Sequence, residues 1–175
     1  MPQQGFANIV PDQITGANTT DIGKHVGLRK DGAGGNQYIL GFNAGAASVA
    51  AGAAMVRNTA VSTVVPYGYA STASSAEGSA GIAGVCAESV ASSRPFWLQT
   101  AGTFTAGVVS SAGSRAALLT RWIPSSGVTY QVAATAVTTS AFEASPGNVY
   151  FYNAQSIAAS GTSAVLMIVP GNDLT

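Results

Sequence analysis

The chain of 175 residues has very little of the chemistry that enzymes use, since it contains one histidine, one cysteine and seven carboxylates. Nucleophilic catalysis by serine or cysteine needs a base, most often a histidine, held beside the nucleophile. His25 and Cys86 lie far apart in the sequence, and Cys86 sits in an apolar, strand-like run typical of a buried structural thiol. We therefore expect no catalytic residue in this chain and no enzymatic activity.

Sites for metals, cofactors, nucleic acids and membranes also lack their usual residues. One histidine and one cysteine do not make a zinc site, and the acidic residues are too scattered for a calcium loop. The glycine-rich stretch at residues 32–36 lacks the Lys-Ser/Thr that completes a phosphate-binding loop. The zero net charge leaves no basic footprint for nucleic acid, and no basic amphipathic helix is present for a membrane surface. We expect no metal, no cofactor, no nucleic-acid partner and no membrane partner.

Charge of either sign is scarce throughout the chain. Charged residues make up 8% of it, against about 25% in an average soluble domain. Half of the chain is alanine, glycine, serine and threonine. A freely soluble domain usually keeps a charged surface and a net charge away from zero. The composition therefore predicts that neighbouring molecules cover much of this surface; the alternative is an exposed but neutral Ser/Thr surface.

The sequence shows no targeting segment. Its first residues lack the cationic start and apolar run of a signal peptide, and no apolar stretch is long enough to span a membrane. A single cysteine cannot form an internal disulfide. These features favour assembly in a cytoplasm over a secreted pilin or adhesin.

Two regions differ in composition. Residues 1–37 hold nearly half of the charged side chains together with isolated apolar residues such as Phe6, Ile9 and Val10. This region ends in the glycine-rich stretch at 32–36, which is typical of a hinge. We predict an extended N-terminal arm over residues 1–37 and one β domain over residues 38–175.

Short β segments separated by turn residues recur from residue 38 onward, with no sustained helical period. The predicted strands are 38–42, 54–56, 61–66, 81–89, 94–100, 103–109, 116–123, 128–133, 149–153 and 165–169. This pattern predicts an all-β fold, a small β-barrel or sandwich with an extended N-terminal arm and long loops.

Aromatic side chains are the best candidates for contact with a partner. In strand geometry Tyr150 and Tyr152 share one face and Phe151 takes the other, which suits a strand between a core and a partner. The alternative is a strand of a sandwich whose tyrosine face is half-exposed. The predicted partner contacts are Phe6, Ile9, Val10, Trp97, Trp122, Tyr150 and Tyr152.

Three short motifs between residues 50 and 119 carry a resemblance to a known family. They are Gly81-Ile82-Ala83-Gly84-Val85-Cys86, the aromatic strand Pro95-Phe96-Trp97-Leu98-Gln99, and the turn Gly102-Thr103-Phe104. This region resembles the head decoration (cement) proteins of tailed bacteriophages. The resemblance implies a small β-barrel that clusters, often as trimers, on the outside of the capsid, and an N-terminal arm that ties it to the shell. Residues 91–94 depart from the family pattern, and residues after Thr120 have no counterpart in it.

The expected function is therefore that of a viral structural protein. As a capsid decoration subunit it would form homotrimers or other homo-oligomers, bind the major capsid protein on the outer surface of the virion, and assemble in the host cytoplasm. Two alternatives stay open: another virion component, such as a tail or head-fibre subunit, and a carbohydrate-binding β-sandwich with Trp97, Trp122 or the Tyr150–Tyr152 strand as stacking platforms.

Overall fold

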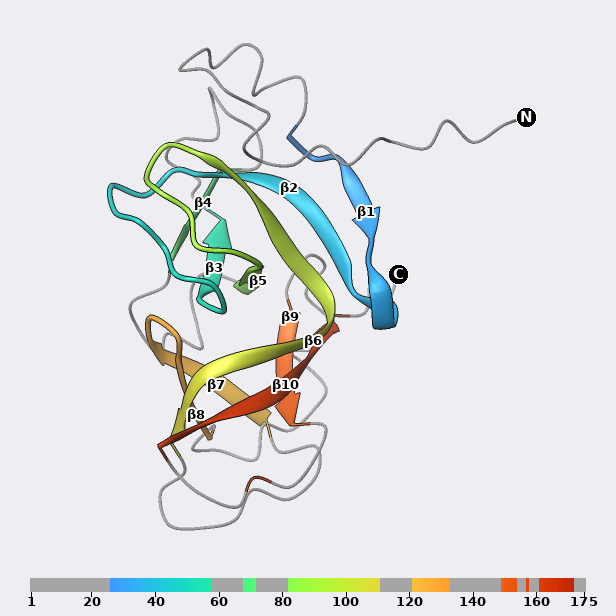
Figure 1. Ribbon diagram of the computed structural model, residues 1–175, viewed down its shortest axis with the longest axis vertical. Helices are drawn as coiled ribbons and strands as arrows, with labels where there is room; N and C mark the ends of the chain where they lie inside the picture. Colours follow the sequence, from blue (N-terminus) through green and yellow to red (C-terminus); the bar gives the residue numbers. More distant parts are fainter. Residues whose placement is uncertain are drawn as a thin grey trace, which may run out of the picture.

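The computed structural model describes residues 26–57, 68–71, 82–110, 121–132, 149–153, 157 and 161–171. These residues form an all-β fold with closed β-barrel pairing, so the predicted fold class is confirmed and the barrel is the correct choice over the sandwich (Figure 1). The only helix among them is the single 3₁₀ turn η2. The elements are β1 (Arg29–Asp31), η2 (Ala33–Gly35), β2 (Gln37–Asn43), β3 (Ala54–Arg57), β4 (Gly68–Ser71), β5 (Ile82–Cys86), β6 (Pro95–Ser110), β7 (Arg121–Ser126), β8 (Thr129–Val132), β9 (Val149–Asn153) and β10 (Thr162–Pro170).

Strand β6 runs through the middle of the molecule and belongs to two barrels (Figure 1). Its first half pairs with β2 and β5, and its second half pairs with β10 and β8. We call the set of β2, β4, β3, β5 and the first half of β6 the N-terminal barrel. The second half of β6 with β10, β9, β7 and β8 is the C-terminal barrel.

Both barrels close by the same order of pairing. Within each, the first strand along the chain pairs antiparallel with the fifth and parallel with the third. The second strand pairs antiparallel with the third and the fourth, and the fourth pairs with the fifth. Closure leaves no open sheet edge within these pairings, which removes a common site of uncontrolled strand addition.

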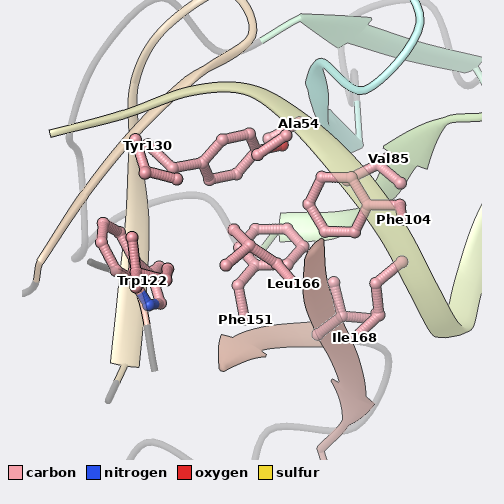
Figure 2. Close-up of a cluster of buried hydrophobic side chains, with 12 residues drawn as sticks. Ala54, Val85, Phe104, Trp122, Tyr130, Phe151, Leu166 and Ile168 are labelled. Carbon is pink, nitrogen blue, oxygen red and sulfur yellow. The ribbon is translucent and has the colours of Figure 1, made fainter. Parts of the chain in front are cut away.

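Strand β6 contributes buried side chains to the cores of both barrels. Phe96 and Leu98 point into the N-terminal barrel beside Met55, whereas Phe104 and Ala106 point into the C-terminal barrel. Phe104, Tyr130 and Phe151 form edge-to-face ring contacts with centroids 5.2 to 5.5 Å apart (Figure 2). Such pairs add stabilisation beyond the burial of their area.

The two barrels are packed against each other through side chains as well as through β6. Ala54 of β3 and Val85 of β5 are fully buried in the core of the C-terminal barrel (Figure 2). The Tyr130 hydroxyl donates a hydrogen bond of 2.6 Å to the carbonyl of Gly52, in the turn before β3. The tertiary structure is therefore one continuous unit across its described residues.

The prediction of a turn at Gly102-Thr103 is wrong. The chain bends there but does not reverse its direction, and β6 continues through the bend. Gly102 has a φ of +95°, a conformation that residues with a Cβ rarely adopt. The buried Gln99 amide bridges the bend by donating to the carbonyls of Ala101 (3.2 Å) and Thr103 (2.9 Å). The Asn36 side-chain oxygen accepts a bond of 3.0 Å from the Thr103 amide. These polar contacts satisfy the backbone at the point where β6 passes between barrels.

Most other strand predictions agree in position with small differences at the ends, but the predicted strand 116–123 shares only residues 121–123 with β7, and residues 116–120 lie outside the described residues. The prediction of 149–153 matches β9, and 38–42, 54–56 and 128–133 overlap β2, β3 and β8. Strand β4 was not predicted, because its sequence Gly-Tyr-Ala-Ser adjoins a Ser/Ala-rich stretch. The predicted strand 61–66 lies outside the described residues.

The end of the predicted arm is part of the sheet. β1 pairs antiparallel with β2, from Arg29 opposite Ile39 to Asp31 opposite Gln37. The predicted glycine hinge forms η2 and the turn into β2. Residues 1–25 of the predicted arm lie outside the described residues.

Candidate interaction surfaces

The structure places the predicted contact residues in very different surroundings. Trp97, Trp122 and Tyr150 are buried, with 6%, 1% and 6% of their surface exposed, and Tyr152 is half-buried. Phe6, Ile9 and Val10 lie outside the described residues. Burial within the chain leaves little of the first three side chains for a partner to touch.

Trp122 belongs to the core of the C-terminal barrel. Its ring lies among the buried side chains of that core (Figure 2), and its indole N–H points at the Asn153 side-chain oxygen at 3.5 Å. Asn153 is itself fully buried. The tryptophan therefore contributes to packing and to satisfying a buried amide.

Trp97 lies on the outer face of the N-terminal barrel, opposite Leu40 in the neighbouring strand. We call Leu40, Phe42 and Trp97 the covered face, because Val26 and Leu28 pack against this cluster. The Lys30 ammonium of β1 lies 4.0 Å from the centre of the Trp97 ring, which is cation–π geometry. Partial burial lowers the pKa of Lys30, and the nearby Glu88 carboxylate opposes that shift. The segment preceding β2 thus seals this face with two apolar side chains and one cation.

Along β10, the outer surface of the C-terminal barrel is more exposed than the covered face, although Tyr150 of β9 on the same surface is buried. Val165 of β10 is 37% exposed and is the large apolar side chain that stands out on the described surface. Met167, Val169 and Tyr152 are half-buried beside it, and Thr103 and Thr105 of β6 are exposed opposite Met167 and Val165. We call these six residues the open face.

The open face contains no charged side chain. Val165, Met167 and Val169 alternate with the interior residues Leu166 and Ile168, so β10 is apolar on both sides. In the register of the sheet, Arg121 of β7 is the partner of Tyr152. The open face is therefore uncharged and partly exposed, with Val165 as its most exposed apolar side chain.

The tyrosine strand has the predicted geometry. Phe151 points into the core, and Tyr150 and Tyr152 lie on the opposite side of β9, so this prediction is confirmed. Tyr150 is nevertheless buried, and of the two tyrosines only Tyr152 belongs to the open face.

Cys86 is a buried thiol of the N-terminal barrel, in agreement with its predicted structural role. Its S–H donates to the Glu88 carbonyl at 2.8 Å, and burial raises the pKa of the thiol to about 12. The thiol is therefore protonated at neutral pH and shielded from reagents.

Two further features concern the described residues alone. They contain no group of three or more His, Cys, Asp or Glu side chains placed to hold a metal ion. No helix among them has the length and apolar character needed to cross a membrane.

No protein-family model matches the chain, and no curated protein matches it significantly.

Sequence reasoning missed the open face, although it placed a strand at 165–169. The sequence signal for this face was the uninterrupted apolar run from Val165 to Val169. A strand with one side in solvent usually alternates apolar and polar residues instead. The pattern indicates apolar residues on both sides, but not which side another part of the protein covers.

Proposed function

We propose that this chain is a virion structural protein of a tailed bacteriophage, a decoration subunit that binds the major capsid protein on the outer surface of the head. The motifs between residues 50 and 119 support the capsid assignment through their resemblance to cement proteins. In this proposal the protein assembles in the host cytoplasm, works as a homotrimer or another homo-oligomer, and has no catalytic role.

The observation that carries the proposal is the uncharged open face of the C-terminal barrel. Transfer of a charged side chain from water into an interface carries a desolvation penalty, whereas apolar groups gain from the same transfer. A partner can therefore cover the open face with little desolvation penalty. A small apolar contact is weak alone, but repetition over a closed shell makes each contact reinforce its neighbours.

A co-sedimentation experiment tests this function. The purified chain is mixed with heads of the source phage that lack it, and bound protein is measured by gel after centrifugation. We expect saturable binding at a fixed ratio to the major capsid protein, and heads that withstand a higher temperature. A protein that stays in the supernatant at all concentrations would overturn the proposal.

The tail and head-fibre alternative is separated by location. Electron microscopy of particles carrying a gold-labelled chain is expected to show label over the shell surface. Label confined to the tail or to fibres would replace the decoration role with that alternative.

The carbohydrate-binding alternative loses two of its stacking platforms. Trp97 and Trp122 are buried within the chain, and Trp97 already carries Lys30 over its ring. A sugar needs an exposed aromatic face to stack on, so tryptophan fluorescence is expected to show no response to glycans.

A further inference from the structure

Strand β1 has a free edge, in contrast to the strands of the two barrels. It lies along the outer side of β2 (Figure 1), and among the described strands it is the one that pairs with a single neighbour. Its three residues, Arg29, Lys30 and Asp31, are all exposed. Charge is scarce in this chain, yet every residue of β1 carries it. Any strand that pairs with this edge therefore meets a defined order of charges.

The backbone hydrogen bonds show which groups of β1 face the free edge. The Leu40 amide of β2 donates to the Leu28 carbonyl at 2.8 Å. Backbone groups alternate in direction along a strand, so Lys30, two residues after Leu28, also directs its N–H and carbonyl toward β2. Arg29 and Asp31 then direct theirs away from β2, to the free edge. These two residues are the ones to which an added strand would bond.

The lysine in the middle of β1 does not block this edge. Charged side chains, lysine above all, usually protect an edge strand from pairing. The Lys30 ammonium lies 4.0 Å from the centre of the Trp97 ring and 5.2 Å from the centre of the Tyr38 ring. Tyr38 belongs to β2 and Trp97 to β6, so the lysine side chain is directed over the N-terminal barrel. The charge that would oppose an added strand is thereby held away from the edge.

We propose that β1 pairs antiparallel with β1 of a second copy of this chain, with Lys30 at the two-fold axis. In this register Arg29 of each copy is opposite Asp31 of the other, and each such pair exchanges both of its N–H···O bonds. The contact joins the same surface of both copies, so it closes on itself as a dimer. The proposal rests on the proposed function and deepens it, because it names a contact between subunits that is separate from the open face.

The charge order of β1 is complementary to itself. Arg29 and Asp31 lie on the same side of the strand, and antiparallel pairing about Lys30 reverses their order in the second copy. Two pairs of opposite charge form, which stabilise antiparallel strands, whereas like charges directly opposite destabilise them. A shift of the register by two residues places two arginines or two aspartates opposite each other. The sequence of β1 therefore selects a second copy of itself in a single register.

The first test exchanges the charges in full-length chains, without any capsid. One chain carries Arg29→Asp and the other carries Asp31→Arg. Each variant alone places like charges opposite each other in this register, whereas a mixed pair restores opposite charges at both positions. We expect sedimentation equilibrium at high protein concentration to show a wild-type dimer. Each variant alone should associate about tenfold more weakly, and the equimolar mixture should regain wild-type association.

The matched control is Arg94→Asp, which changes an exposed arginine just before β6 by the same amount of charge. Its association is expected to equal that of the wild-type chain. This control separates the effect of position from the effect of net charge. Circular dichroism of all the variants should show the folded state.

The second test fixes the register by disulfide trapping. Chains carrying Arg29→Cys and Asp31→Cys are mixed and oxidised. Residues of a hydrogen-bonded antiparallel pair have Cα atoms about 5.5 Å apart, which a disulfide can span. We expect a linked dimer in the mixture and none from either variant alone, because two copies of one position are two residues out of register. The native thiol of Cys86 is buried and does not compete in the folded protein.

Three results would each overturn the proposal. A wild-type chain that stays monomeric in sedimentation, with no link in the oxidised mixture, shows that β1 does not pair with itself. Association that neither charge variant weakens shows that copies join through another surface. Links formed by either cysteine variant alone, as readily as in the mixture, show that the strands do not meet in this register.

The proposed function can fail separately. Pairing of β1 without binding of the wild-type chain to heads would leave a self-associating protein that is not a decoration subunit. Binding to heads by a chain that shows no pairing would leave the decoration role and remove this contact.

Discussion

The N-terminal and C-terminal barrels have the same order of strand pairing but differ in what fills and covers them. The C-terminal core is built around three rings in edge-to-face contact, whereas the N-terminal core relies on smaller side chains around Phe96, Leu98 and Met55. One outer face is sealed by the segment before β2, and the other is open. Two barrels with the same order of strand pairing can therefore differ in which of their outer side chains are exposed. The outer surface can have a function that the pairing order does not dictate.

Removing one large ring from each core is expected to have the largest effect. Phe151→Ala and Phe96→Ala each empty a fully buried site, and each is expected to lower the free energy of unfolding by about 3–5 kcal/mol. Because Ala54 and Val85 join the C-terminal core and β6 is shared, urea denaturation should show one transition in both variants. Two separate transitions would contradict the packing of the barrels into one cooperative unit.

The bend in β6 gives the next largest effect. Gly102→Ala places a methyl group against Asn36 at a φ of +95°, and we expect a loss of about 3 kcal/mol in unfolding free energy. Gly127→Ala is the matched control, since Gly127 also has positive φ but nothing lies within 4 Å of its added Cβ. The control should lose only about 1–2 kcal/mol. Equal losses would show that the contact with Asn36 does not constrain the junction.

A smaller effect is expected from the polar contact between the barrels. Tyr130→Phe removes the buried hydroxyl that donates to the Gly52 carbonyl, leaving that acceptor without this partner. We expect a loss of about 1–2 kcal/mol, measured by urea denaturation, with the ring contacts retained. An unchanged stability would mean that the hydroxyl contributes nothing net to the join between barrels.

The smallest effect concerns the covered face. Lys30→Ala removes the cation over Trp97 and should lower stability by about 0.5–1 kcal/mol more than Arg29→Ala does. Both variants remove one positive charge from β1, so the difference isolates the contact with the ring. Trp97 fluorescence should also change in Lys30→Ala. Equal losses of stability in the two variants would show that the cation–π contact does not stabilise the covered face.

Several strands could be predicted because their local sequence shows them. Alternating apolar residues in 149–153 and in 94–100 identify strands without any knowledge of their neighbours. The bend at Gly102 was mistaken for a turn, because a glycine followed by threonine is compatible with both. The structure shows a bend because the Gln99 amide bridges it and the side chain of Asn36, far away in the sequence, accepts from the Thr103 amide.

The candidate surface was harder to predict than the fold. Trp97, Trp122 and Tyr150 are large aromatic residues in strands, and such residues serve cores and interfaces equally well. Which role each takes depends on the segments that pack over it, as Lys30 does over Trp97. The sequence does not single out Val165, because a valine in an apolar strand has the same local pattern whether its side chain is buried or exposed.

By itself the amino-acid sequence determined the all-β class, the positions of most strands and the buried character of Cys86. These follow from local alternation, from turn residues and from an apolar run, which do not depend on distant contacts. Only the tertiary structure decided that β6 joins two barrels of one pairing order, that Trp97 is covered and that Val165 is open. The physical reason is that pairing and covering depend on contacts between residues far apart in the chain, such as Leu40 with Trp97 and Thr105 with Val165.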